Sequence, residues 1–193
     1  MGGQSPSPVA DPARLVAALL ERGETLALCE SLTAGLAAAT VAGVPGSSAV
    51  LRGGLVTYAT ELKASLAGVP QEVLDRVGPV SAECAAAMAV GVKDRCGSDW
   101  GVSLTGVAGP GQQDGHPVGE VWIGLADPSG AVAAVRAGAQ DPGVATGQAD
   151  GRGDAQPLLS GSRNSIREQA VAWALGLVID AAKQLPSAVS PGR

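Results

Sequence analysis

The chain has 193 residues, of which 46% are hydrophobic and only 2% aromatic, and its formal net charge is -5. This length and apolar content suit one compact domain with a sizeable core, and they exclude disorder throughout, which requires low hydrophobicity. The acidic balance and the scarcity of aromatic rings argue against nucleic acid as a partner. Phosphate backbones require basic patches, and single strands require stacking platforms.

Neither a membrane span nor a secretory signal is visible. The longest apolar run, residues 170–179, is shorter than the roughly 20 residues that a bilayer requires. Residues 1–12 lack the basic start and apolar segment of a signal peptide. The cysteines form no C-x-x-C pair, and His116 is the only histidine. We therefore expect a cytoplasmic protein with reduced thiols, with no membrane partner and no metal.

The first half of the chain alternates helix and strand signals. Asp11 is typical of a helix N-cap, Pro12 of a first helical position, and Gly23 of a helix end. The elements expected next are a buried strand over 25–29, an Ala-rich helix ending near 43, a strand over 53–58, a helix over 61–66, a helix from 70 and a helix from 81 to about 95.

Strand signals return over 100–104, 121–126 and 131–135, and residues 127–130 predict a hairpin turn between the last two. A final helix is expected over 165–185. The pattern predicts an α/β fold: a three-layer α/β/α sandwich on a mixed sheet with one hairpin in the C-terminal half. We expect a single domain over 11–186, with disordered tails at 1–10 and 187–193 and a flexible insertion at 139–161.

The first segment that could form a catalytic or binding site joins the strand over 25–29 to the following helix. It has the sequence Glu-Ser-Leu-Thr-Ala-Gly over residues 30–35. Free backbone N–H groups at a helix start attract an anion, so this turn is a candidate anion site at the carboxyl edge of the sheet. The alternative is that Ser31 is an ordinary N-cap.

The second segment runs from Gly53 to Lys63 and holds the only tyrosine of the chain, Tyr58. Lys63 falls in the first turn of the expected helix, where the helix dipole and partial burial would lower its pKa and make it a usable base. A solvated helix lysine is the alternative. The chain has only three lysines, the other two being Lys93 and Lys183, while arginine supplies the other ten positive charges. This usage favours a catalytic Lys63.

The third segment, Leu104–Gly111, is Gly-rich and again follows a strand. Such backbone can cradle a phosphate or approach a ring closely. It matches neither the dinucleotide fingerprint nor the P-loop, because no Gly-Lys-Ser/Thr follows and no helix is signalled after it. A simple turn is the alternative.

Together these segments resemble the C-terminal domain of the CinA (competence/damage-inducible) proteins, known as nicotinamide mononucleotide deamidases when they stand alone. The family motifs include Ala-Glu-Ser-Cys-Thr-Gly-Gly, Pro-Gly-Ser-Ser, Gly-Gly-Val-Val-x-Tyr with a Lys five residues after the Tyr, and Thr-Gly-Ile-Ala-Gly-Pro-Gly. Counterparts of these and of three shorter motifs occur in order over 29–35, 45–48, 53–63, 66–69, 78–81, 105–111 and 117–121.

The chain departs from the family pattern at two positions of the first motif. Leu32 stands where the family has Cys, and Ala34 stands where it has Gly, so that an added methyl group would crowd a phosphate. The stretch 139–161 is longer than the family pattern. The amino-terminal domain of full-length CinA proteins has no counterpart here, so the stand-alone form is expected.

The resemblance implies an amidohydrolase that converts nicotinamide mononucleotide to nicotinate mononucleotide and ammonia, without metal or cofactor, in pyridine nucleotide (NAD) recycling. With no usable histidine, a Ser/Lys dyad is the remaining standard solution, with Lys63 as the base and Tyr58 beside it. The nucleophile is Ser31 or Ser48. Ser31 ranks first, because it and Lys63 both follow strands and meet if these are parallel, whereas Ser48 precedes a strand.

The remaining candidates are expected to bind the substrate. Thr105 and Gly106 would hold ribose, ring or oxyanion, and Arg163 or Arg167 would pair with the phosphate, with surface salt bridges as the alternative. The turn after the first strand contributes Glu30, Thr33 and Gly35, and Glu30 is expected to order this loop rather than act as a second acid.

A non-catalytic nucleotide-binding or regulatory module on the same scaffold is the rival function. Its support is Leu32, Ala34 and the long stretch 139–161, since an altered site can bind without turnover. A partner-recruiting competence or DNA-damage factor is a third interpretation, but the sequence shows no basic patch for it. The acidic, Ala-rich composition is compatible with a homodimer and does not require one.

Overall fold

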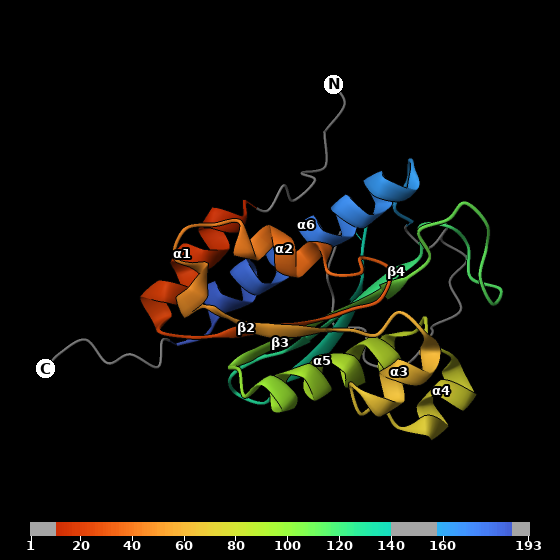
Figure 1. Ribbon diagram of the computed structural model, residues 1–193, viewed down its shortest axis with the longest axis horizontal. Coiled ribbons are helices and arrows are strands. Elements are labelled where there is room, and N and C mark those ends of the chain that lie inside the picture. The colour runs from red at the N-terminus through yellow and green to blue at the C-terminus, as the bar shows by residue number, and fades with distance from the viewer. Residues whose placement is uncertain (1–10, 140–157, 187–193) are drawn as a thin grey trace, which may run out of the picture.

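A mixed five-stranded sheet forms the middle layer of the computed structural model, which describes residues 11–139 and 158–186 (Figure 1). The strand order is β2-β1-β3-β4-β5. β1 pairs in parallel with β2 and β3, whereas β4 is antiparallel to both of its neighbours. The strands are β1 (Leu26–Glu30), β2 (Leu51–Val56), β3 (Trp100–Gly106), β4 (Val121–Ala126) and β5 (Val132–Arg136).

Helices cover both faces of this sheet, three on each side (Figure 1). One face carries α1 (Pro12–Arg22), α2 (Leu36–Ala42) and α6 (Arg163–Gln184), and the other carries α3 (Thr60–Ser65), α4 (Gln71–Val77) and α5 (Ala82–Cys96). A buried hydrophobic cluster fills the space between each helical layer and the sheet. The predicted three-layer α/β/α sandwich on a mixed sheet is therefore confirmed.

Local capping explains where the helices begin and end. Asp11 accepts a hydrogen bond from the N–H of Ala13 at 2.9 Å, and Gly23 ends α1 in the left-handed conformation with φ of 65°. α6 begins two residues earlier than predicted, because Ser162 is its N-cap and accepts from the N–H of Ser165 at 3.2 Å. This earlier start places Arg163 in the first turn of α6.

The predicted hairpin joins β4 to β5 through residues 127–130. Asp127 and Ala131 form a backbone hydrogen bond of 3.0 Å, and Gly130 adopts a positive φ of 91° that suits glycine. The expected tails at 1–10 and 187–193 lie outside the described residues, as does most of the expected insertion at 139–161. Among the described residues, no helix is long and apolar enough to cross a membrane.

The parallel pairing of β1 with β2 and β3 places the ends of these three strands together. β1, β2 and β3 run in the same direction, and Glu30, the last residue of β1, pairs with Val56 on one side and Leu104 on the other. The segments that follow these three strands therefore emerge at one edge of the sheet. These are the three segments singled out from the sequence.

A close approach of α5 to the chain after α3 fixes the second of these segments. A Cβ atom on Gly91 would lie 1.6 Å from the carbonyl oxygen of Ala67. Ala67 and Val69 in turn donate backbone hydrogen bonds to Leu62 and Lys63 at 3.4 and 3.0 Å. Because Gly91 has no side chain, α5 can pack closely against the chain that follows α3, and this contact helps to fix the position of Lys63.

We expect Gly91→Ala to destabilise the protein by about 2 kcal/mol or more, because the new methyl group overlaps backbone that has to move. The sign is opposite to that at an exposed helix position, where Gly to Ala stabilises by up to about 1 kcal/mol. Chemical denaturation measures the effect. The neighbouring Val90→Ala, on a residue that is 37% exposed, is the control and is expected to change stability by less than about 0.5 kcal/mol. Equal stability of Gly91→Ala and the wild type would contradict the close approach.

Candidate functional site

A pocket of about 290 Å³ opens at the edge of the sheet where β1, β2 and β3 end. All three segments after these strands contribute to its lining, together with the α4–α5 connection and the first residue of α6. None of the lining residues carries a carboxylate. The lining residues are Ser31, Leu32, Tyr58, Thr60, Lys63, Pro79, Val80, Thr105, Gly106, Val107, Ala108, Gly109, Gly111, Gln112, Gln113 and Arg163.

The centre of the pocket is a buried lysine paired with a serine. Lys63 Nζ donates to Ser31 Oγ at 2.9 Å and to the carbonyl oxygen of Thr57 at 2.7 Å. The lysine is only 2% exposed. The parallel pairing of β1 and β2 brings the two side chains together, because one follows each strand.

Burial sets the protonation chemistry of this pair. It lowers the pKa of Lys63 by penalising the ammonium form, and the smaller effects of Cys84, Cys29 and Glu61 oppose that shift. Lys63 is the fourth of the six residues of α3 and lies in its last turn rather than its first, so the N-terminal dipole expected to disfavour its charged form does not act there. Burial also raises the pKa of the Cys29 and Cys84 thiols to about 11. Thiolates are therefore scarce at neutral pH.

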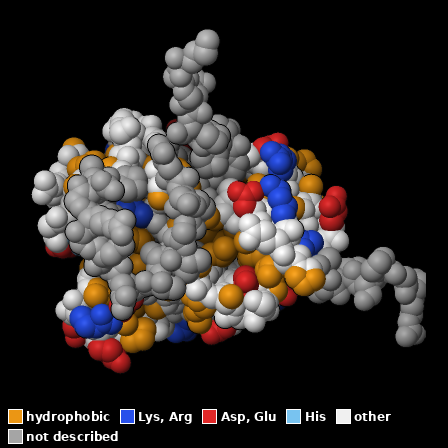
Figure 2. All heavy atoms as spheres, turned by 180° about the vertical axis from the view of Figure 1, so that it is seen from behind, with side chains coloured by type: hydrophobic (Ala, Val, Ile, Leu, Met, Phe, Trp, Pro, Cys, Tyr) orange, Lys and Arg blue, Asp and Glu red, His pale blue; other side chains and the backbone are white. Residues whose placement is uncertain are grey.

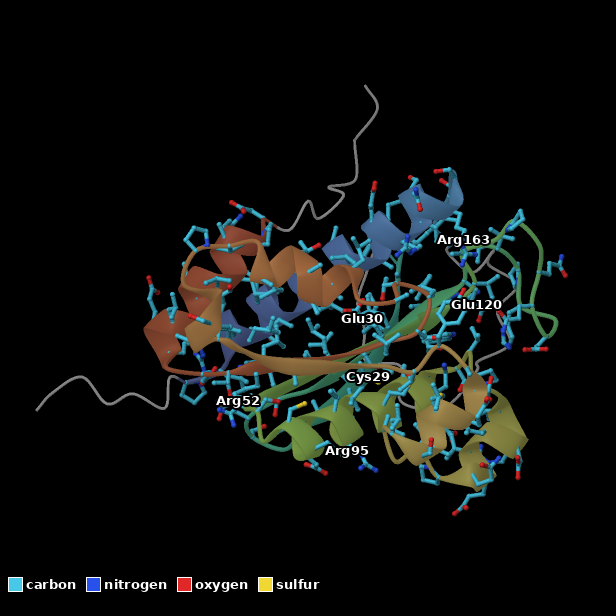
Figure 3. All side chains as sticks on the ribbon, viewed as in Figure 1. Cys29, Glu30, Arg52, Arg95, Glu120 and Arg163 are labelled. Carbon is cyan, nitrogen blue, oxygen red and sulfur yellow. The ribbon has the colours of Figure 1, made fainter. Side chains whose placement is uncertain are left out.

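The backbone N–H groups at the start of α2, which follows the turn after β1, bind a different partner from the predicted one. The buried carboxylate of Glu30 accepts hydrogen bonds from the N–H groups of Gly35, Ala37 and Ala38 at 2.9, 3.0 and 2.8 Å (Figure 3). An acidic side chain of the protein itself therefore occupies the donors that were expected to hold a substrate anion, and that prediction is wrong for them. Glu30, Thr33 and Gly35 do not line the pocket.

Ser48, the alternative nucleophile, does not line the pocket, whereas Ser31 does. Ser48 is exposed in the short 3-10 helix Ser47–Ala49, which precedes β2, whereas Lys63 follows that strand. A strand of six residues separates the two positions.

Arg163 and Tyr58 meet at the rim of the pocket. Arg163 Nη2 donates to the hydroxyl oxygen of Tyr58 at 2.8 Å, and Nη1 donates to the carbonyl oxygen of Gly109 (Figure 3). Tyr58 is 55% exposed. Three segments far apart in the sequence thus converge on one guanidinium group, which faces the space a ligand would fill.

Arg167, the other predicted phosphate ligand, does not line the pocket. Its Nε donates to the carbonyl oxygen of Leu32 at 3.1 Å and its Nη2 to that of Thr33 at 2.7 Å. The side chain binds the main chain of the turn that carries Ser31. The expected phosphate contact and the surface salt bridge are both replaced by this structural contact.

The third segment contributes mostly main chain. The hydroxyl of Thr105 donates to the carbonyl oxygen of Pro79 at 2.7 Å, and a Cβ on Gly106 would lie 2.3 Å from the carbonyl oxygen of Glu120. Five further lining residues had been given no role: Thr60, Pro79, Val80, Gln112 and Gln113. Gln112 and Gln113 directly follow the Gly-rich run, Thr60 lies in the second segment, and Pro79 and Val80 lie in the family motif over 78–81, so each could have been found by extending or using these signals.

The two departures from the family pattern have different consequences. Leu32 is buried, packs into the core and lines the pocket. Ala34 is exposed and does not line the pocket, so it does not crowd a ligand there. Its backbone φ is 50°, in the left-handed region. That conformation explains why glycine suits this position and alanine is strained.

We expect Ala34→Gly to raise the free energy of unfolding by about 1 kcal/mol, because glycine adopts the left-handed conformation without strain. Thermal and urea unfolding measure the change. The matched control is Ala39→Gly, an exposed position inside α2, where the same substitution is expected to lower stability by about 0.5–1 kcal/mol. A loss of stability at both positions would contradict the strain at Ala34.

Known proteins resemble this chain in sequence over most of its length. Residues 10–143 match the family model described as the CinA C-terminal domain. A CinA-like protein of Frankia casuarinae is 53% identical over 114 residues, which are 59% of this chain and 26% of that protein. A CinA-like protein of Thermosynechococcus vestitus is 52% identical over 122 residues, 62% of this chain and 29% of that protein. The match spans less than a third of the length of these curated relatives.

Solved structures show the same fold over nearly the whole chain. A CinA superfamily protein from Klebsiella pneumoniae superimposes with a TM-score of 0.78 at 26% identity, covering 92% of this chain and 99% of that one. A competence/damage inducible protein from Agrobacterium tumefaciens gives 0.76 at 29% identity, covering 95% and 100%. The family model covers well over half of the sequence, and the chain therefore belongs to the CinA C-terminal domain family.

Proposed function

We propose that this chain hydrolyses the carboxamide of nicotinamide mononucleotide to give nicotinate mononucleotide and ammonia, by a Ser/Lys mechanism that needs no metal. The observation that carries the proposal is the 2.9 Å hydrogen bond between Lys63 Nζ and Ser31 Oγ in the pocket. Family membership supports the reaction class. The free cysteines support a cytoplasmic location for it.

Lys63 is the general base for the first step. In its free amine form it accepts the hydroxyl proton of Ser31, and the serine oxygen adds to the carboxamide carbon. Because Lys63 Nζ also donates to the fixed carbonyl of Thr57, the orientation of the amine is set before substrate binds. Preorganisation of this kind lowers the entropic part of the barrier.

Lys63 then returns the proton. The lysine ammonium donates it to the leaving amide nitrogen, which departs as ammonia and leaves an acyl ester on Ser31. Water attacks this ester with Lys63 again as the base, which releases the carboxylate and the free serine. Thr105 and Gly106, which line the pocket, are the proposed contacts of the ribose, the ring or the oxyanion.

The charge of the pocket favours a phosphorylated substrate. On the face shown in Figure 2, basic side chains lie among acidic ones on the described surface. The pocket differs, since its lining includes the Arg163 guanidinium and no carboxylate. A cation without a neighbouring acid among the lining residues attracts an anion, and a guanidinium pairs bidentately with phosphate. We propose that Arg163 binds the phosphate of the mononucleotide.

Lys63→Ala and Ser31→Ala are each expected to lower ammonia release from nicotinamide mononucleotide about a thousandfold or more, because the dyad acts as a unit. Ser48→Ala and Lys183→Ala, both outside the pocket, are the matched controls and should keep wild-type turnover. Wild-type turnover in Lys63→Ala would exclude the dyad. Mononucleotide binding by the wild type without any ammonia would instead assign the non-catalytic nucleotide-binding or regulatory role.

The rate of ammonia release is expected to rise with pH, because Lys63 acts as a base only after losing its proton. Burial lowers the pKa of Lys63, so the inflection of kcat/KM should lie below the ordinary lysine value of 10.5. A pH profile of initial rates measures it. The control is Tyr58→Phe, which removes the hydroxyl group at the pocket rim and should retain the inflection. A rate that falls over the same range would rule out Lys63 as the base.

A further inference from the structure

Three contacts from different parts of the chain hold the turn that carries Ser31. The carboxylate of Glu30 binds the start of α2, and the N–H of Ser31 donates to the carbonyl oxygen of Leu104 in β3 at 2.9 Å. The third contact comes from Arg167 in α6. It is the only one of the three made by a side chain distant in sequence, at 134 and 135 positions from the residues it binds.

The guanidinium of Arg167 spans two successive peptide groups. Its Nε donates to the carbonyl oxygen of Leu32 and its Nη2 to the carbonyl oxygen of Thr33. Its Nη1 donates to the side-chain oxygen of Asn164 at 3.2 Å. A planar group with donors in a fixed fork constrains both carbonyls at once, which a lysine ammonium on a flexible stem does not. The first of these carbonyls belongs to the residue directly after Ser31.

Arg163 and Arg167 are four residues apart and lie on the same side of α6. Arg163 reaches the rim of the pocket, whereas Arg167 reaches the turn behind Ser31. Arg163 therefore faces the pocket, whereas Arg167 contacts the main chain of the turn and its own helix.

We propose that Arg167 is a positioning residue that keeps the hydroxyl of Ser31 within reach of Lys63. This role rests on the proposed function, since it concerns the nucleophile of that reaction. Lys63 is held independently by the carbonyl of Thr57, so a shift of the turn would move Ser31 away from a fixed amine. A displacement of about 1 Å costs up to about 100-fold in rate.

A substitution of Arg167 tests how the turn is held more cleanly than a substitution of Glu30. Glu30 is 1% exposed, and its replacement would leave the N–H groups at the start of α2 buried without acceptors. Arg167 is only partly buried, so water can replace its hydrogen bonds to the two carbonyls. The fold then survives while the constraint on the turn is lost.

The experiment compares Arg167→Ala and Arg167→Lys with the wild type in two assays. One measures kcat and KM for ammonia release, and the other measures the rate at which phenylmethanesulfonyl fluoride modifies Ser31, followed by mass spectrometry. Arg167→Ala is expected to lower kcat and the modification rate by about 10- to 100-fold with KM little changed. Added guanidinium ion should restore part of both rates, and Arg167→Lys should be intermediate. Arg14→Ala, at an exposed arginine of α1, is the control and should match the wild type.

Wild-type modification and turnover in Arg167→Ala would overturn the proposal, as would a loss confined to KM, which indicates a substrate contact. If Arg167→Ala does not fold, wild-type rates in Arg167→Lys would overturn it. The proposed function fails separately if the wild type releases no ammonia. In that case slower modification of Ser31 in the variants still supports the positioning role.

Discussion

The central physical constraint in this structure is the burial of the amine of Lys63, a residue that is 2% exposed. Lys63 Nζ has two neutral hydrogen-bond acceptors, the hydroxyl of Ser31 and the carbonyl of Thr57, and no lining residue of the pocket offers it a carboxylate. A buried ammonium group without an ion partner is costly, and this cost shifts the lysine toward its free base. The parallel β1–β2 pair, the short helix α3 and the close approach at Gly91 all serve to place that amine beside Ser31.

The turn after β1 forms the start of a helix and, in the proposed function, also presents the nucleophile. Glu30 fills the N–H groups of α2 with a carboxylate from inside the protein, so the helix needs no external anion for its stability. In the proposed function the substrate anion is bound by the guanidinium of Arg163, which reaches the pocket rim from α6. The first two turns of α6 would then act on the ligand through Arg163 and on the nucleophile through Arg167.

Most elements of the fold could be predicted because their signals are local, although the strand expected over 53–58 runs over Leu51–Val56. The caps of α1, the hairpin turn at 127–130 and the apolar run of β4 were all readable from neighbouring residues, and β4 has the predicted bounds. The start of α6 was missed by two residues, because Ser162 and Ser165 are equally good caps in isolation. The strain at Ala34 could not be seen, since a backbone angle is set by the turn around it.

For the site, the sequence determined which segments follow strands and contain usable groups, and therefore singled out Ser31, Lys63 and the Gly-rich run. Only the tertiary structure shows that Ser31 contacts Lys63, because the two residues are 32 positions apart and meet through strand order rather than spacing. It also decided which arginine faces the pocket and where the carboxylate of Glu30 points. Hydrogen bonds of long sequence separation fix these roles, and no local pattern encodes them.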